Sequence, residues 1–301
     1  MQETEFIWLN GKFVKWEDAK IHLLSHALHY GSSVFEGIRC YKTAKGPAIF
    51  RLSDHVKRFF SSFSVFGGEM PYSQEQVEKA ICETIKVNKM QEAYIRPITF
   101  YGYGAMGLSN FDKCAINMAI AVWPWPKYLG EKAISVKISK FIRLHPQSVP
   151  MEAKIGGYYV NSMLATIDAK KDGFDEALLL DYKNNIAEGP GENIFIVNHG
   201  VIYTPKIGTI LPGITRDSII KIASDFGYPV KEQTLTTEDI FEAQEVMMTG
   251  TAAEVTAIGK VNDKKIGNGK EGRITARLRQ AYSAIVHGKS EKYASWLTYV
   301  R

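Results

Sequence analysis

Two prolines, Pro124 and Pro126, end a run of apolar residues and divide the chain into two parts of different pattern. Before them, YIRPITFYGYG and CAINMAIAVWPWP predict buried strands, and the second strand must end where proline cannot donate to a sheet ladder. With 301 residues, of which 45% are hydrophobic, the chain has room for two cores. We therefore predict a small domain over residues 1–125, a linker over 126–133 and a larger domain over 134–301.

The first part combines strands with helices. Asn10 and Gly11 join two short apolar runs and predict a β-hairpin, because both residue types tolerate positive φ. Apolar residues at helical spacing follow Ser53 and Asp54, and they predict a helix. Ser73 and Gln76 form the capping box of a second helix. These patterns predict a small domain of the α/β kind.

The second part predicts a mixed sheet with helices. ISVKIS alternates as a strand, and a helix is expected from about Val160 to a stop at Gly173. The segments ALLLDYKNNIAEG, ENIFIVNHG and VIYTP predict a strand meander. LPGITRDSIIKIASDFG predicts a helix with Thr215 as N-cap and Gly227 as its stop, and TTEDIFEAQ predicts a shorter one. The fold class is therefore α+β, with a larger domain of mixed sheet.

Composition excludes several classes of protein. The chain carries 37 basic and 32 acidic residues, a net charge of +5, without a basic run, which argues against nucleic acid as a partner. No stretch approaches the ~18 apolar residues of a membrane helix, and MQETEFIWLN is acidic where a signal peptide is basic, so we expect a cytoplasmic protein. Three cysteines, Cys40, Cys82 and Cys114, predict reduced, buried thiols rather than a disulfide framework.

Two motifs resemble sites of other classes. GYGAMG satisfies the dinucleotide pattern GxGxxG, but LSNFDKCA after it shows no helical stripe, so we interpret it as a glycine loop. A nucleotide-binding oxidoreductase is the alternative. His22, His26 and His29 fall at helical spacing, but no Cys, Asp or Glu neighbours complete a metal site. We interpret them as structural histidines near an interface and expect no metal, with a metal-binding or structural protein as the alternative.

A lysine, an acid and two anion-binding backbone segments remain. Lys154 in MEAKIGGYYV is flanked by small and apolar residues, which would desolvate its amine as covalent catalysis requires. Glu188 lies between glycines in NIAEGPGENIF, before an apolar strand. The first amides of the helix in LPGITRDS and the small residues of TGTAAE could each hold a phosphate, to which Arg58 could add a charge. Each feature alone has an ordinary structural explanation.

Six motifs in order, YGSSVFEGIRCY, YIRP, KIGGYY, EGPGENIF, LPGITRDSII and GTAAEVT, resemble the fold-type IV pyridoxal-phosphate enzymes, specifically the branched-chain amino acid aminotransferases. The resemblance runs from about residue 7 to the C-terminus. It implies pyridoxal 5′-phosphate in a cleft between the domains, with Lys154 as the catalytic lysine, Glu188 on the pyridine nitrogen and Tyr159 on the ring O3′. The implied cofactor-binding residues are Arg58, Lys154, Tyr159, Glu188, Leu211, Ile214, Thr215 and Thr251.

The resemblance also implies a substrate site that accepts both an apolar side chain and the γ-carboxylate of glutamate. Arg96 with Tyr128 would meet that γ-carboxylate, while the α-carboxylate would be held by Tyr94 and the amides of Thr251 and Ala252. A neighbouring subunit would supply the glycine loop around Met106. The implied substrate-binding residues are Tyr30, Phe35, Gly37, Tyr94, Arg96, Met106, Leu108, Trp125, Tyr128, Thr251 and Ala252.

The implied activity is reversible transfer of the amino group of L-leucine, L-isoleucine or L-valine to 2-oxoglutarate, by a ping-pong mechanism in a homo-oligomer whose active site lies at the subunit interface. Amino acids and 2-oxo acids are the expected small-molecule partners. D-amino acid aminotransferases, (R)-amine transaminases and aminodeoxychorismate lyases share the fold and are the alternatives. One departure is visible, because Tyr158 stands where many family members have Asn.

Overall fold

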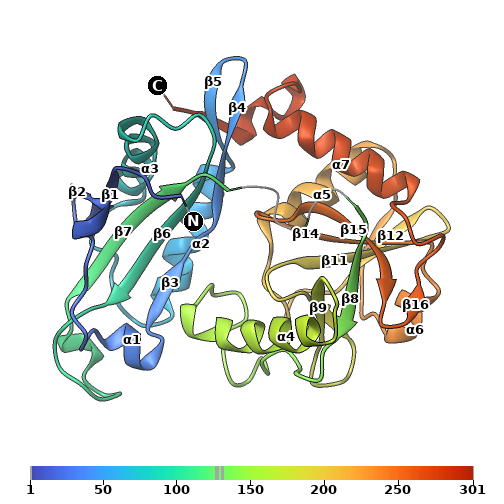
Figure 1. Ribbon diagram of the computed structural model, residues 1–301, viewed down its shortest axis with the longest axis horizontal. Coiled ribbons are helices and arrows are strands. Elements are labelled where there is room, and N and C mark those ends of the chain that lie inside the picture. The colour runs from blue at the N-terminus through green and yellow to red at the C-terminus, as the bar shows by residue number, and fades with distance from the viewer. Residues whose placement is uncertain (1, 126–128, 130–131, 301) are drawn as a thin grey trace. The chain divides into compact units, whose positions relative to one another are not determined.

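The computed structural model describes residues 2–125, 129 and 132–300 (Figure 1). Packing divides the chain into two compact units. The first comprises residues 1–126, 153–158 and 285–301, and the second comprises 127–152 and 159–284. The sequence placed Lys154 and the C-terminal residues in the larger domain, whereas both pack with the first unit. The reason is backbone pairing: Ile155 bridges to Val34, and strand β17 pairs with β5.

The first unit is built on one sheet. Among the described residues it has eight strands, in the order β17-β5-β4-β6-β7-β1-β2, with β3 paired to β6. Asn10 and Gly11 adopt φ of 47° and 89° between β1 and β2, which confirms the predicted hairpin. The strands are β1 (Phe6–Leu9), β2 (Lys12–Lys15), β3 (Ser33–Phe35), β4 (Ile38–Thr43), β5 (Gly46–Phe50), β6 (Ala93–Tyr101), β7 (Ile116–Trp123) and β17 (Leu297–Tyr299).

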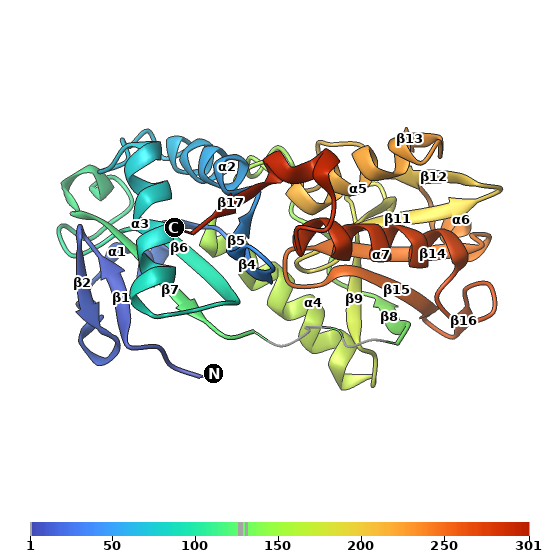
Figure 2. The ribbon, with the colours of Figure 1, turned by 90° about the horizontal axis from the view of Figure 1, so that it is seen from above.

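Helices α2 and α3 supply the other half of this unit's core, and α3 lies along β6 and β7 (Figure 2). Phe59, Phe63 and Ile81 are fully buried at helical spacing, as the apolar stripes predict. The capping box of Ser73 and Gln76 is confirmed. The helices are α1 (His26–Tyr30), α2 (Leu52–Ser64) and α3 (Gln74–Val87), with 3₁₀ turns η1 (Trp16–Asp18), η2 (Phe111–Lys113), η3 (Gly156–Tyr158) and η4 (Glu291–Trp296).

The second unit contains the other sheet. Within the described ranges it has nine strands, in the order β10-β9-β8-β15-β14-β11-β12-β13, with β16 paired to β15. β8 runs parallel to both β9 and β15, so this sheet is mixed, as the sequence predicts. The strands are β8 (Ile134–Ile138), β9 (Glu176–Leu180), β10 (Ile186–Glu188), β11 (Asn193–Asn198), β12 (Val201–Thr204), β13 (Val230–Glu232), β14 (Glu245–Gly250), β15 (Glu254–Val261) and β16 (Lys264–Lys265).

The predicted meander is wrong between β10 and β11. β10 pairs with β9, whereas β11 pairs with β12 and β14, so the turn over 189–192 carries the chain from one edge strand to the middle of the sheet. Helix α4 packs on β8 and β9, while α5 packs on β13 and β14 (Figure 1). The helices are α4 (Tyr159–Lys171), α5 (Ile214–Asp225), α6 (Thr237–Phe241) and α7 (Arg273–Val286).

Helix α5 begins earlier than predicted. Its N-cap is Gly213 rather than Thr215, and Thr215 lies in the first turn, 4% exposed. A Cβ on Gly213 would lie 1.9 Å from Oδ1 of Asn193, so the close approach of these two residues requires glycine. Gly227 has φ of 78° just after the helix, which confirms the predicted stop.

Every helix within the described residues falls short of the length and apolar character that crossing a membrane requires.

Gly213→Ala tests the close approach at the start of α5. Because Asn193 must move to admit the Cβ, we expect the free energy of unfolding to fall by about 1–3 kcal/mol, the usual cost of forcing extra volume into packed structure. Gly191→Ala is the control, because nothing lies within 4 Å of its added Cβ. Calorimetric unfolding of both variants measures the effect, and equal melting temperatures for Gly213→Ala and wild type would contradict it.

Candidate active site

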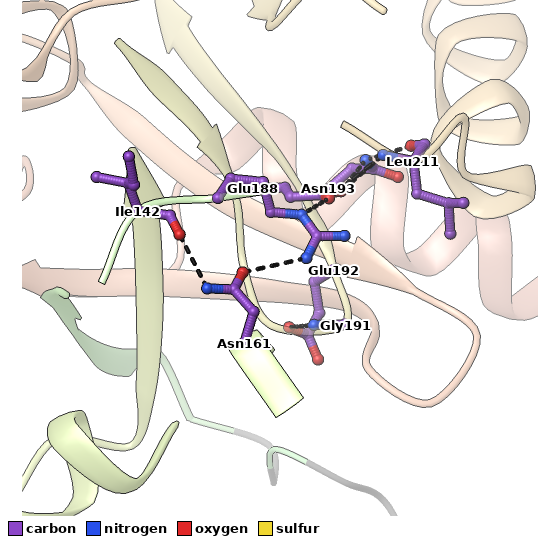
Figure 3. A network of polar contacts seen from close by, with 8 residues as sticks. Ile142, Asn161, Glu188, Gly191, Glu192, Asn193 and Leu211 are labelled. Carbon is purple, nitrogen blue, oxygen red and sulfur yellow. Dashed lines mark hydrogen bonds and ion pairs between the residues drawn. The ribbon is translucent and has the colours of Figure 1, made fainter. Parts of the chain in front are cut away.

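Glu188 is a buried acid at the end of β10, 4% exposed. Its carboxylate accepts hydrogen bonds from Arg143 Nε at 2.7 Å, Asn193 Nδ2 at 3.2 Å and the backbone N–H of Leu211 at 3.1 Å (Figure 3). These donors come from a loop, from β11 and from the segment before α5. Charge-assisted hydrogen bonds from three directions hold the carboxylate in one orientation.

Arg143 is a member of this network that sequence reasoning missed. It lies 45 positions before Glu188, in a loop whose pattern gives no signal. Its backbone N–H donates to the carbonyl of Leu180, and its Nη1 donates to Asn161 Oδ1 at 3.4 Å. Asn161 in turn donates to the carbonyl of Ile142 (Figure 3). The Arg143 guanidinium is therefore held through both its Nε and its Nη1. The Glu188 carboxylate therefore has a fixed, buried counter-charge.

Two backbone segments of the second unit offer amides to an anion. The first turn of α5 contains Ile214 and Thr215, and the backbone N–H groups of a first helical turn point toward the N-terminal end, where they favour an anion. The other segment is the turn from Thr251 to Ala253 between β14 and β15. A Cβ on Gly250 would lie 3.1 Å from the carbonyl of Gly191, so glycine lets this turn approach the one beside Glu188 closely.

The adjacent tyrosines 158 and 159 belong to different units. Tyr159 is the first residue of α4, whereas Tyr158 ends the turn η3 and packs against the core of the first unit. Burial raises the pKa of Tyr158. The departure from the family pattern at Tyr158 therefore concerns the packing of the first unit.

Lys154 belongs to a segment that is fastened to the first unit through its backbone. Its N–H donates to Ser62 Oγ at 2.9 Å, and its carbonyl accepts from the N–H of Phe35 at 3.2 Å. Two glycines follow because the chain passes close to its neighbours: a Cβ on Gly156 would lie 2.3 Å from Ser33 Oγ. The KIGG pattern thus places the lysine beside β3 and α2.

An aromatic cluster of the first unit surrounds two cations. Lys154 Nζ lies 5.2 Å from the ring centre of Phe35, and the guanidinium of Arg96 lies 4.5 Å from the same ring. Arg96 Nη2 donates to the hydroxyl of Tyr94 at 3.3 Å. The ring of Tyr94 lies 4.9 Å from that of Trp125. The structure therefore brings together five residues that the sequence places in one active site.

Gly37 belongs to the same cluster, because a Cβ there would lie 2.0 Å from the hydroxyl oxygen of Tyr94. Three other predicted substrate residues lie elsewhere in the first unit. Tyr30 packs on His26, which is within 3.4 Å of the Gly107 carbonyl, and Met106 and Leu108 are exposed at 37% and 76%. Tyr128 lies outside the described residues.

The two other motifs have structural explanations. No helix opens after GYGAMG, because the chain continues through η2 into β7, so the requirement of a dinucleotide loop is unmet there. His26 pairs with Ser32 Oγ at 2.7 Å, and His22 packs on the ring of Tyr103. His29 lies within 3.0 Å of the carbonyl of Leu23.

Arg58 lies in a buried cluster with two residues to which sequence reasoning gave no role. Glu36 accepts from Arg58 Nε at 2.6 Å and Nη2 at 2.9 Å, and it pairs with His55 Nδ1 at 2.7 Å. Burial alone would raise the pKa of Glu36, but the charge of Arg58 and the contacts with His55 hold it well below its ordinary range. Burial lowers the pKa of His55 from 6.5, against the opposing pull of Glu36.

The lowered pKa of the buried His55 makes stability depend on pH. His55 faces Glu36, Arg58 and Lys154, and its pKa is lower in the folded than in the unfolded chain, so the unfolded chain binds more protons. We therefore expect the free energy of unfolding to fall as the pH drops below about 6.5.

In His55→Gln the free energy of unfolding should depend less on pH, and thermal unfolding between about pH 5.5 and 7.5 measures this dependence. The control is His29→Gln, at an exposed histidine, which should keep the wild-type slope. An unchanged slope in His55→Gln would contradict the assignment.

Known proteins resemble this chain over its whole length. Residues 33–261 match the family described as amino-transferase class IV. The branched-chain-amino-acid aminotransferase of Pseudomonas aeruginosa is 44% identical, over 98% of this chain and 97% of that relative. The crystal structure of a T.th. branched-chain amino acid aminotransferase complexed with N-(5′-phosphopyridoxyl)-L-glutamate has a TM-score of 0.97 and 46% identity, and it covers 100% of both chains.

The same T.th. enzyme complexed with 4-methylvaleric acid has a TM-score of 0.96, again at 46% identity and with 100% of both chains covered. The expected fold, a fold-type IV aminotransferase built of helices and sheets, is therefore confirmed. Because the family match spans most of the chain and the relatives align from end to end, this chain belongs to the class IV aminotransferases and, within them, to the branched-chain-amino-acid aminotransferases.

Proposed function

We propose that this chain transfers the amino group of L-leucine, L-isoleucine or L-valine reversibly to 2-oxoglutarate, with pyridoxal 5′-phosphate as cofactor. The observation that carries the proposal is the placement of Lys154 and Arg96 against the ring of Phe35. The amine of Lys154, which would react with the cofactor, and the guanidinium of Arg96, which would bind a carboxylate, therefore lie near the same aromatic ring. The T.th. relative has been crystallised with a phosphopyridoxyl adduct of glutamate and with 4-methylvaleric acid, which supports both a carboxylate-bearing and a branched apolar ligand.

The residues present suit this cofactor by their donor chemistry. Arg58, the first amides of α5 and the turn at Thr251 provide a guanidinium and N–H groups for a phosphate. Just before that turn, Thr249 Oγ1 is buried and finds no hydrogen-bond partner among the described residues. An unsatisfied buried hydroxyl at this place favours a bound polar group.

When bound, pyridoxal 5′-phosphate supplies an electron sink for the negative charge that develops at the substrate Cα, and it carries the amino group between the two half-reactions. Lys154 supplies the amine that bonds to the cofactor and moves the proton at the substrate Cα. Glu188 would accept a hydrogen bond from the protonated pyridine nitrogen. The network of Arg143, Asn193 and Leu211 fixes Glu188 for that task before the cofactor arrives.

The substrate side chain would meet Arg96 and the aromatic cluster. Arg96 lies near the rings of Phe35, Tyr94 and Trp123, at 4.5, 5.4 and 5.7 Å. Its Nε is buried and has no hydrogen-bond partner within the described part of the chain. The γ-carboxylate of glutamate would satisfy this guanidinium, whereas leucine would pack on the rings around it.

We also propose a homo-oligomer in which one subunit lends its glycine loop to a neighbour. The segments 21–30 and 102–108 pack together through His26, whose backbone N–H donates to the carbonyl of Gly102. They present exposed apolar side chains, with Leu23 73% and Leu108 76% exposed. Large apolar side chains exposed on two segments that pack together favour an interaction site there.

The cysteines suit a reducing compartment, so we place the enzyme in the cytoplasm. Cys40, Cys82 and Cys114 are free thiols in the described part of the chain. Burial raises the pKa of Cys40 to about 12 and that of Cys82 to about 11, which keeps both in the unreactive thiol form.

Lys154→Ala tests the catalytic assignment. We expect the wild-type protein to be yellow and its visible band to move on addition of L-leucine, and we expect the variant to lose the band shift and turnover together because it lacks the amine. Lys140→Ala, at a side chain 70% exposed, is the control and should behave as wild type. A colourless wild-type protein that ignores added cofactor would overturn the proposal, and dominant activity on D-alanine or (R)-1-phenylethylamine would overturn the substrate class.

Arg96→Met tests the dual substrate site. We expect the KM for L-glutamate to rise about tenfold to a hundredfold, because a charged hydrogen-bonding partner is lost. The KM for L-leucine should change little. Arg39→Met is the matched control, because Arg39 lies 5.0 Å from the Tyr41 ring in the same sheet but pairs with Glu92. Stopped-flow absorbance measures both half-reactions, and a proportional loss with both substrates would refute the role of Arg96.

A further inference from the structure

Glu36 is a buried acid, outside the residues assigned to the site, that pairs with Arg58. Glu36 is fully buried and accepts two hydrogen bonds from Arg58 and pairs with His55. Within this cluster the Arg58 side chain alone keeps appreciable exposure, 12%, against 2% for His55 and none for Glu36. Of the three side chains, that of Arg58 is therefore the one that reaches toward the surface of the unit.

The cluster is built by two segments with fixed backbones. The N–H of Glu36 donates to the carbonyl of Pro97, and the N–H of the preceding Phe35 donates to the carbonyl of Lys154. His55, Arg58 and Ser62 are spaced three and four residues apart on α2, so they share one face of that helix. Ser62 binds the backbone of Lys154, so this polar face of α2 contacts both the lysine segment and Glu36.

The chemistry of the cluster indicates that the Glu36 carboxylate serves to orient Arg58 rather than to neutralise its charge. A buried carboxylate is costly unless it is paired, and an apolar residue of similar size would avoid that cost. What the carboxylate adds is geometry, because its two oxygens bind Nε and Nη2 of Arg58 side by side and so fix the plane of the guanidinium. His55 contacts Oε2 of Glu36, the same oxygen that binds Nη2, so a third contact holds the carboxylate in place.

We propose that Glu36 and His55 are positioning residues that aim the Arg58 guanidinium at the phosphate of the cofactor. The inference rests on the proposed function, because it takes Arg58 as a phosphate ligand. The proposal has a specific consequence: Glu36 and His55 contribute to the affinity for the phosphate group of the cofactor. They do not contribute to binding of its reacting end, which Lys154 and Glu188 would contact.

The test compares two ligands that differ only in the phosphate. The full chain, freed of cofactor, is titrated with pyridoxal 5′-phosphate and with pyridoxal, and the visible band gives both dissociation constants. In Glu36→Gln we expect the constant for pyridoxal 5′-phosphate to rise about tenfold to a hundredfold, and that for pyridoxal to stay at its wild-type value.

Variants of His55 keep the test valid if Glu36→Gln fails to fold. His55→Leu removes the donor to Glu36 and should weaken pyridoxal 5′-phosphate selectively, whereas His55→Asn places an amide N–H near the position of Nδ1 and should restore much of the affinity. Glu92→Gln is the control, because Glu92 pairs with the buried Arg39 of the same unit, outside the assigned site.

The positioning role would be overturned if Glu36→Gln and His55→Leu bound both ligands with wild-type dissociation constants. It would also be overturned if the two dissociation constants rose equally. A wild-type chain that takes up neither ligand would instead overturn the proposed function itself.

Discussion

The pairing of residues 153–158 with β3 is the constraint on which the first unit's chemistry depends. The bridge between Val34 and Ile155 fixes the register, and the carbonyl of Lys154 accepts from the next strand residue, Phe35. Glycines at 156 and 157 permit the contact, because side chains there would strike Ser33 and Gly31. Lys154 thereby belongs to the unit that carries the aromatic cluster, although it lies between two stretches of the other unit in sequence.

Each unit holds a buried carboxylate that is paired with an arginine of the same unit. Glu36 is paired with Arg58 and His55, and Glu188 is paired with Arg143. Breaking such pairs leaves an uncompensated charge, so both acids are fixed before any ligand binds. Preorganised charges of this kind need not reorient when a ligand's charge appears, which is the usual source of electrostatic advantage in an active site.

Features set by neighbouring residues could be predicted from the sequence, whereas features set by distant ones could not. The hairpin at Asn10 and the capping box at Ser73 depend on a few adjacent residues, and both were found. The start of α5 was misplaced because the close approach of Asn193, a residue of strand β11, requires glycine at position 213. Arg143 was missed for the same reason, since only the folded sheet brings its loop to Glu188. The motif carrying Glu36 was recognised, but its partners on α2 gave no sign of their pairing.

The surroundings of Arg96 show how one site can suit both a carboxylate and a hydrocarbon chain. Aromatic faces offer a cation part of the stabilisation that an anion would give, about 0.5–2 kcal/mol for each well-placed ring. With Phe35, Tyr94 and Trp123 near its guanidinium, Arg96 need not lose all its favourable electrostatics when an apolar side chain occupies the site. A paired acid in this position would neutralise the arginine and exclude the second carboxylate of glutamate. The rings leave the charge of Arg96 available and present an apolar surface, so under the proposed function the same residues would accept both glutamate and leucine.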